Sequence, residues 1–279
     1  EAKPGDVTVD VKIDMTPAKA FIEPFNYIKP VGSPGEATCV AVLKGDKIQQ
    51  IKNLNVTMGK DKATGGLLTF GQVGKEWDVK SGSFSNLSLG PDNNFSLKFT
   101  QSSPTQMNFI INGDRVDARS FLVAETPDQI AAQTPRTSAV NVTATARVAR
   151  TGDKADQIVS NPKINATVDA NGDIRSLDIA ATVGTGPLSV VMQPDASGQM
   201  KLKVRASDAG ATLHAFDIYD NIVGGQLQVD GTQMPGGKIN DIKGAATIRD
   251  FRVVDAPFLA QLMNGFSFEG MDELVKQKG

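Results

Sequence analysis

Apolar and polar residues alternate along most of this 279-residue chain, and that period of two constrains its fold more than any other feature. Successive side chains of a β-strand point to opposite faces, so alternation predicts strands with one buried face and one wetted face. The segment from Val7 to Ile13 (VTVDVKI) places valine and isoleucine on one side and Thr, Asp and Lys on the other. The same pattern recurs in LNVTM, FSLKF, MNFII, VNVTATARV, INATV, LDIAA, LSVVM, MKLKVRA and LQVDG. The sequence therefore predicts roughly a dozen strands, more than an average sheet holds.

Turn residues separate these segments. Asn171-Gly172 is a strong hairpin signal, because a type I′ turn needs a positive φ at both of its central residues. LGPDNNFS, VGTGPLS and QPDASGQM are further turns rich in Gly, Pro, Asn and Asp. Many strands joined by short turns predict an antiparallel meander rather than βαβ units.

Few segments of the chain have helical signals, and those segments are short. The predicted helices cover 16–28 (Thr16 as N-cap, Pro17 in the first turn, Pro24 as an interruption), 126–133 (opening Thr126-Pro127), 207–225 (cap Ser207 or Asp208, end Gly224-Gly225), 255–266 (cap Asp255, then Pro257, end Gly265) and 270–279. Together they hold only about fifty residues, too few to cover one face of so many strands.

The apolar face of the strands must nevertheless leave water, because each fully buried Val, Leu or Ile contributes about 1.5–3 kcal/mol. It can meet a second sheet, close on itself or be reserved for an apolar ligand. Alternation alone is compatible with all three.

Composition narrows the function classes. The net charge is −2 and no basic block exists, which argues against a nucleic-acid partner. Only 6% of residues are aromatic, a poor supply for stacking sugars or bases. No apolar run approaches the roughly 20 residues that span a bilayer. The first residues, EAKPGDVTVD, lack an initiator Met and a signal-peptide pattern, so we expect them to be an internal start.

The sequence offers little for catalysis. Cys39 is alone, which predicts a buried structural thiol and excludes an internal disulfide. His214, the single histidine, falls in a predicted helix, which favours a structural or exposed role, and one histidine is too few for a His-based metal site. The segment 169–178 (DANGDIRSLD) has Ile174 where a calcium loop needs Gly and is better explained as a hairpin turn. We predict no enzyme activity, no catalytic residue, no metal and no cofactor.

The C-terminal third carries a family resemblance. Residues 205–232 (RASDAGATLHAFDIYDNIVGGQLQVDGT), followed by 242–263 (IKGAATIRDFRVVDAPFLAQLM), resemble the C-terminal region of the AsmA-like proteins of Gram-negative bacteria, most closely the long YhdP-like members. Two weaker similarities lie upstream, in 27–40 (YIKPVGSPGEATCV) and in 111–122 (INGDRVDARSFL), where Val116-Asp-Ala-Arg119 matches a Leu-Asp-Ala-Arg type of motif. The specific part covers about 60 residues, and the rest agrees in its strand-and-turn texture.

The resemblance implies a mainly β fold: an elongated, curled antiparallel sheet of the repeating β-groove type with a few short helices. Residues 1–279 would form one β-groove segment of a larger protein, with an N-terminal part (1–135) and an AsmA-like C-terminal part (136–279). Such proteins are periplasmic and usually anchored to the inner membrane, here by a segment outside this sequence. They are understood as bridge-like lipid carriers, related in architecture to eukaryotic chorein-type transporters.

The function implied is phospholipid transfer between the inner and outer membranes, with acyl chains on an apolar groove and headgroups in water. The partners would be phospholipids, membranes at the ends of the full-length protein and envelope proteins, but no nucleic acid. Lipid contact is expected from aliphatic residues on one face of the C-terminal strands: Leu177, Ile179, Leu188, Val190, Met192, Leu202, Val204, Leu227, Val229 and Ile248. A carboxylate among them, as in Val204→Asp or Leu188→Asp, is expected to block passage.

The short apolar helices would then plug or cap the groove, or touch a membrane. The side chains concerned are Leu213, Phe216 and Ile218, and Phe258, Leu259, Leu262 and Met263. Three alternatives remain: a periplasmic scaffold or assembly factor with a filled β-sandwich core, a secreted β-rich binding module or adhesin, and a β-helical polysaccharide-degrading enzyme.

Overall fold

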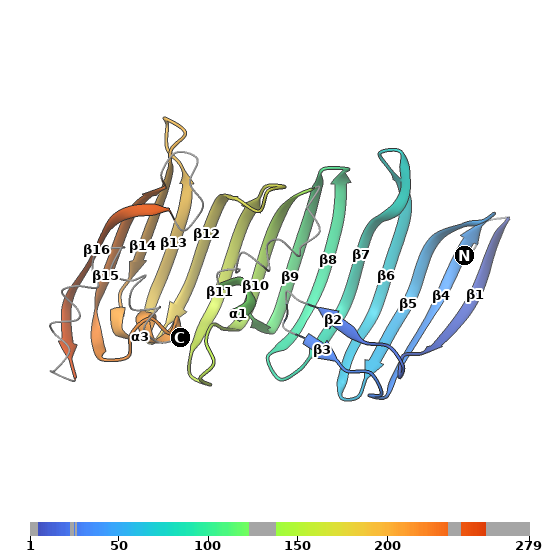
Figure 1. Ribbon diagram of the computed structural model, residues 1–279, viewed down its shortest axis with the longest axis horizontal. Helices are drawn as coiled ribbons and strands as arrows, with labels where there is room; N and C mark the ends of the chain where they lie inside the picture. Colours follow the sequence, from blue (N-terminus) through green and yellow to red (C-terminus); the bar gives the residue numbers. More distant parts are fainter. Residues whose placement is uncertain (1–4, 23–24, 26, 123–137, 234–240, 255–279) are drawn as a thin grey trace. The chain divides into compact units, whose positions relative to one another are not determined.

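Strands dominate the computed structural model, which describes residues 5–22, 25, 27–122, 138–233 and 241–254. Fourteen strands form one sheet, and two short strands form a separate hairpin (Figure 1). The strands of the sheet are β1 (Asp6–Asp14), β4 (Gly35–Lys44), β5 (Lys47–Met58), β6 (Asp61–Val73), β7 (Glu76–Leu89), β8 (Asn93–Ser103), β9 (Gln106–Asp117), β10 (Ala139–Arg150), β11 (Ile158–Val168), β12 (Ile174–Val183), β13 (Gly186–Pro194), β14 (Met200–Ala206), β15 (Ile222–Gln233) and β16 (Ile242–Val253). The hairpin pairs β2 (Ala20–Ile22) with β3 (Tyr27–Lys29), and the described helices are α1 (Arg119–Leu122) and α3 (Ala209–Ala215).

The structure confirms the prediction of a mainly β chain whose strands form a largely antiparallel meander. Neighbours in the sheet follow chain order, except that β4 lies beside β1 because β2 and β3 leave the sheet. The described strands form no closed or strongly curled sheet, so the expected curl into a groove is not seen in them.

One strand pair departs from the predicted antiparallel pattern. β10 runs parallel to β9, with Met107 opposite Val140 and Phe109 opposite Val142. Parallel neighbours need a connection long enough to return to the starting edge, and residues 118–138 supply it. The helix predicted at 126–133 falls in this connection and lies outside the described residues.

Two predicted helices are corrected by the structure. The described part of 16–28 does not form the predicted helix; Ala20–Ile22 and Tyr27–Lys29 make the β2–β3 hairpin instead, with Phe21 opposite Ile28. The helix predicted at 207–225 begins as expected, because the Asp208 side chain accepts a hydrogen bond from the Ala211 backbone N–H at 3.0 Å. It ends at Ala215, and Gly224-Gly225 belongs to β15. The helices predicted at 255–266 and 270–279 lie outside the described residues.

Contacts divide the chain into two compact units. Unit 1 comprises Glu1–Arg150 and Asp169–Gly172, and unit 2 comprises Thr151–Val168 and Asp173–Gly279. The division at 135 and 136 implied by the family resemblance remains a prediction. Each unit is described by itself below.

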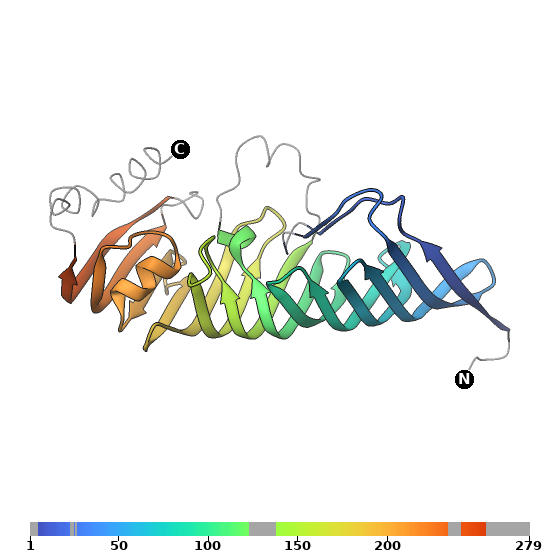
Figure 2. The same cartoon turned by 90° about the horizontal axis from the view of Figure 1, so that it is seen from below.

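The buried core of unit 1 lies under the β2–β3 hairpin (Figure 2). Residues directly opposite each other on neighbouring strands share a face, so the register defines rows across the sheet. One row runs from β1 to β10 through Ile13, Ala37, Val56, Ala63, Leu87, Phe95, Gly113 and Ala146. The hairpin packs against its middle, where the rings of Phe25 and Phe95 lie 4.6 Å apart between centroids.

Gly113 allows the closest backbone approach in this row. A Cβ at Gly113 would lie 2.5 Å from the carbonyl oxygen of Asn94 and 2.6 Å from Cα of Phe95, next to a register shift in β8–β9. Because these are backbone atoms, the strands would have to separate. We expect Gly113→Ala to lower the free energy of unfolding of unit 1 by about 1–3 kcal/mol.

The matched control is Gly71→Ala in β6, where the nearest atom, Cδ of Lys80, lies at an ordinary 3.5 Å. Urea unfolding midpoints of the two variants measure the difference. Equal midpoints would show that β8 and β9 are not packed as closely as described.

Candidate functional site

The ten predicted lipid-contact residues all lie on one face of unit 2. The β11–β16 registers arrange them, with small residues between, in three parallel rows. The rows are Ile164–Ile179–Val190–Val204–Val229–Ala246, Ala166–Leu177–Met192–Leu202–Gly231–Gly244 and Ala181–Leu188–Ala206–Leu227–Ile248. We call this surface the unit 2 apolar face. The structure thus brings together residues that are up to 71 positions apart in the sequence, from Leu177 to Ile248.

Helix α3 covers one end of the unit 2 apolar face (Figure 2). Leu188 and Leu227, in the row nearest the helix, are 2% and 8% exposed and form a buried cluster with Ala209 and Ala215 of α3. Val190 and Val204, in the next row, only border this cluster and are half-buried. Apolar side chains away from the helix therefore retain contact with solvent, which costs free energy unless something apolar covers them.

Distance from α3 does not decide burial everywhere on this side of the sheet, because Met192 and Ile242 are buried as well. Met192 is 2% exposed although it lies in the row furthest from Leu188, between Leu177 and Leu202. Its neighbours Leu177 and Leu202 are half-buried.

The predicted plug residues take different positions. Phe216, which caps the C-terminus of α3, packs at the edge of the buried cluster, whereas Ile218 is 52% exposed. Leu213 is half-buried. The second predicted group, from Phe258 to Met263, lies outside the described residues.

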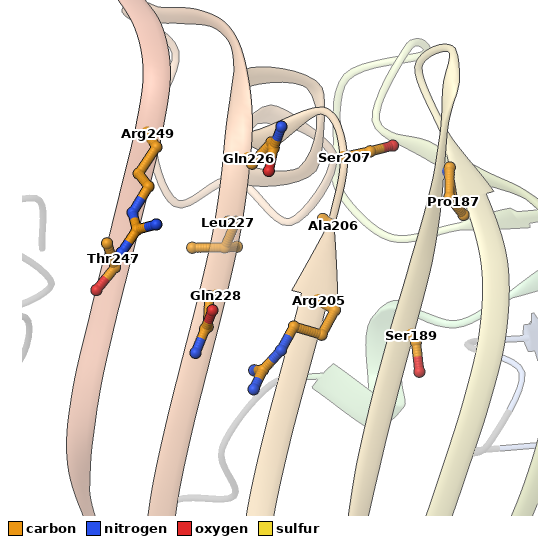
Figure 3. A pocket seen from close by; sticks show the side chains of 10 residues that line it. All are labelled: Pro187, Ser189, Arg205, Ala206, Ser207, Gln226, Leu227, Gln228, Thr247 and Arg249. Atoms are coloured by element: carbon orange, nitrogen blue, oxygen red, sulfur yellow. The ribbon is translucent and has the colours of Figure 1, made fainter.

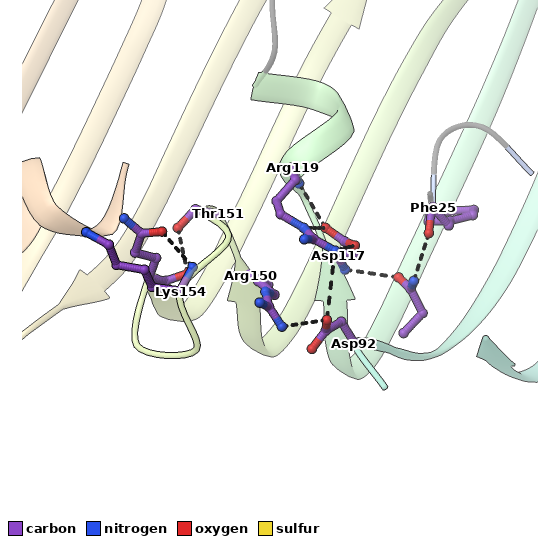
Figure 4. A network of polar contacts seen from close by, with 9 residues as sticks. Phe25, Asp92, Asp117, Arg119, Arg150, Thr151 and Lys154 are labelled. Atoms are coloured by element: carbon purple, nitrogen blue, oxygen red, sulfur yellow. Dashed lines mark hydrogen bonds and ion pairs between the residues drawn. The ribbon is translucent and has the colours of Figure 1, made fainter. Parts of the chain in front are cut away.

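Polar contacts hold α3 and the loop after it in place. Thr151 Oγ1 donates a hydrogen bond to the Ala215 carbonyl at 2.6 Å, at the C-terminal end of the helix. Figure 4 labels Thr151 beside Lys154. Lys154 Nζ lies 2.7 Å from Asp220 Oδ2, and His214 Nδ1 lies 2.8 Å from Asp220 Oδ1. Hydrogen bonds from Lys154 and then His214 lower the pKa of the Asp220 carboxyl group. His214 has a structural setting, as predicted.

Unit 1 carries a comparable surface that the sequence interpretation did not propose as a lipid site. A row of eight residues crosses β1 to β10, beyond the part covered by the β2–β3 hairpin: Val9, Ala41, Ile51, Leu68, Gly82, Phe99, Phe109 and Val142. Val9 is 42% exposed, and Ile51, Phe99 and Phe109 are half-buried. The same alternation marks these strands, but the family resemblance directed the choice of residues to the C-terminal strands.

The Val116-Asp-Ala-Arg119 motif has a structural role in unit 1 (Figure 4). Asp117 Oδ1 accepts hydrogen bonds from the Arg119 backbone N–H and Nε, and Asp117 Oδ2 lies 2.6 Å from Arg119 Nη2. The Asn93 amide joins β9 to the hairpin, because it accepts from Asp117 N and donates to the Phe25 carbonyl, each at 3.0 Å. Arg150 closes the network through an ion pair with Asp92 at 2.8 Å.

The described residues offer no candidate metal site. They contain no group of three or more His, Cys, Asp or Glu side chains placed to hold a metal ion. Residues 169–172 form a turn in which Asp169 Oδ1 accepts from Asn171 N, and it joins the antiparallel β11 and β12 as a hairpin, as predicted. The turn is not of type I′, because only Gly172 of the Asn171-Gly172 pair has a positive φ. Cys39 is half-buried, so the expectation of a fully buried thiol was wrong. None of the described helices is long and apolar enough to cross a membrane.

Comparison of the chain with models of known protein families, with curated proteins and with solved structures found no match. The chemistry of the two faces of the sheet is therefore what bears on function.

Proposed function

We propose that this chain carries phospholipid acyl chains along the apolar faces of its sheet. The observation that supports the proposal is the half-buried state of rows such as Ile179–Val190–Val204–Val229, whose valines pack against the buried cluster but keep part of their surface exposed. A filled β-sandwich would bury such rows under a second sheet. Among the described strands, only the β2–β3 hairpin lies outside the fourteen-stranded sheet, and it packs on the core of unit 1.

The apolar surface suits hydrocarbon. Its side chains are aliphatic in unit 2 and include Phe99 and Phe109 in unit 1. They offer dispersion contacts and exclusion of water but no directional polar group, so they would tolerate an acyl chain in many positions along a row. In this proposal α3 and the β2–β3 hairpin form a raised border of a shallow β-groove within their own units, and headgroups stay in water.

We further propose that the chain is an AsmA-like protein, most similar to YhdP-like members. This membership would place it in the periplasm of a Gram-negative bacterium, tethered to the inner membrane by a segment outside this sequence. It would be one elongated β-groove segment of a larger bridge between membranes, with membranes at the ends of the full-length protein and envelope proteins as further partners. Its work would be non-enzymatic transfer of phospholipid.

Native mass spectrometry of the chain purified from a bacterial envelope tests the proposal. We expect adducts with phospholipid masses that disappear when a short-chain detergent competes for the apolar faces. A chain that binds no phospholipid, and whose purified form takes up no fluorescent acyl-chain probe, would favour the periplasmic scaffold with a filled core instead.

A further inference from the structure

The polar side of β14–β16, opposite the unit 2 apolar face, is strongly basic. The residues on this side alternate with those of the apolar rows and pair across the strands as Lys203–Asp230–Ala245, Arg205–Gln228–Thr247 and Lys201–Thr232–Lys243, with Gln226 opposite Arg249. We call these residues the basic face. Its cations are Lys201, Lys203, Arg205, Lys243 and Arg249, and its one carboxylate is Asp230. The basic face thus has an excess of four positive charges on a chain whose net charge is −2.

Asp230 neutralises only one of these cations directly. Arg205 Nη2 lies 2.7 Å from Asp230 Oδ1, and Arg205 Nη1 donates to the Val229 carbonyl at 2.9 Å. Lys201 Nζ donates to Thr232 Oγ1 and lies 3.6 Å from Asp195 at the neighbouring turn. Among the described residues, the side chains of Lys243 and Arg249 make no hydrogen bond or ion pair, and both residues are exposed. Their charges are available to a ligand.

A hollow of about 340 Å³ lies in the basic face (Figure 3). Two guanidinium groups, those of Arg205 and Arg249, line it together with polar side chains, and no carboxylate does. The polar members are Ser189, Ser207, Gln226, Gln228 and Thr247. Guanidinium, hydroxyl and amide groups together favour an anion with several acceptor oxygens, such as a phosphate group.

We propose that the basic face of β14–β16 docks unit 2 on an anionic phospholipid surface, with lipid phosphate groups at Arg205 and Arg249. The cations of the basic face are spread over neighbouring strands rather than gathered at one point. An anionic bilayer presents many phosphate groups side by side, so a lipid surface matches this broad array better than an acidic protein does. The proposal is independent of acyl-chain carriage, since it uses the opposite side of the sheet.

Vesicle flotation tests the docking. We expect the chain to float with vesicles of phosphatidylcholine and phosphatidylglycerol, not with phosphatidylcholine alone, and to dissociate as salt rises from about 0.1 M to 0.5 M. Lys243→Glu combined with Arg249→Glu should weaken binding by at least about tenfold, because each cation near an anionic surface contributes measurably to binding.

The matched control carries the same change in net charge elsewhere on the polar side of the sheet. It combines Lys98→Glu in β8 with Lys163→Glu in β11, both exposed. Equal loss of binding in both double variants, equal binding to neutral vesicles, or stronger binding to poly-glutamate than to anionic vesicles would overturn the proposal. Displacement from anionic vesicles by millimolar inorganic phosphate would also overturn it, since it would indicate an isolated anion site.

A separate comparison distinguishes this proposal from the proposed function. Val190→Asp, on the unit 2 apolar face, should leave vesicle binding unchanged while removing co-purified lipid. The charge-reversed basic-face variant should retain co-purified lipid.

Discussion

A Val190→Asp variant is expected to fold and yet to carry no phospholipid. Val190 lies in the central row of the unit 2 apolar face, directly between Ile179 and Val204, and is half-buried. Its carboxylate can remain hydrated in the free protein, so the fold should survive. An acyl chain laid along the row would strip that water, and an unpaired charge placed in hydrocarbon costs several kcal/mol. We expect lipid adducts in native mass spectrometry to fall by at least about tenfold.

Val191→Asp is the matched control. It introduces the same group one residue away, on the opposite side of the sheet, where Val191 pairs with Asp178 and Lys203. We expect this variant to keep its lipid adducts. If both variants retain lipid equally, or lose it equally, the assignment of the acyl chains to the apolar face fails.

The structure also ranks the two substitutions suggested by the sequence. Val204→Asp resembles Val190→Asp, because Val204 is half-buried in the same row. Leu188→Asp differs, since Leu188 is packed beneath α3 in the buried cluster with Ala206 and Leu227. A charge there should unfold unit 2 rather than report on lipid.

Alternation was sufficient to predict the strands and their faces because it is a local consequence of backbone geometry. Alternation predicts that Val190 and Val204, which lie on different strands, share one face of the sheet. The register then confirmed that they are direct neighbours.

Features that depend on distant contacts were not predictable in the same way. The Thr16-Pro17 opening favours a helix locally, but packing of Tyr27 and Phe25 on the unit 1 core selects the β2–β3 hairpin. The parallel pairing of β9 with β10 depends on where the connection after Leu122 returns, which no local pattern encodes. Gly224-Gly225 was a reasonable stop signal for a helix, yet both residues adopt a positive φ within β15.

For the candidate site, the sequence predicted which side chains share a face but not how exposed each of them is to solvent. Leu188 and Val190 follow the same pattern, yet Leu188 belongs to the buried cluster with α3 while Val190 lies at its edge and is only half-buried. The basic face was also missed, because its cations come from three strands and form no run in the sequence.

Asp117→Asn is expected to destabilise unit 1 by about 3 kcal/mol, since it removes the charge from a buried ion pair while keeping the side chain's shape. The Asp117 side chain is 4% exposed, and Arg119, whose charge it balances, is only one quarter exposed. The pair joins the end of β9 to α1, and Asn93 connects the Asp117 backbone to the hairpin at Phe25. Loss of the pair should therefore lower the unfolding midpoint of unit 1 in urea.

The pH dependence of this loss has a defined sign. Burial raises the pKa of Asp117, but hydrogen bonds from the Arg119 side chain and backbone, with the charges of Arg119 and Arg150, outweigh burial and lower it overall. A carboxyl group with a lowered pKa in the folded state stabilises the fold fully above its unfolded pKa of about 3.9. That stabilisation is lost as the pH falls through the lower folded value, so wild type and Asp117→Asn should converge in stability at acid pH.

Asp114→Asn provides the control. Asp114 lies on the same strand as Asp117, β9, and forms an ion pair with Arg147 that is exposed to solvent. Its effect on the urea midpoint at neutral pH should be much smaller, as solvent screens an exposed pair. Urea titrations of the three proteins between about pH 7 and pH 3 measure both effects. A constant gap between wild type and Asp117→Asn across this range would show that the Asp117 charge does not stabilise unit 1.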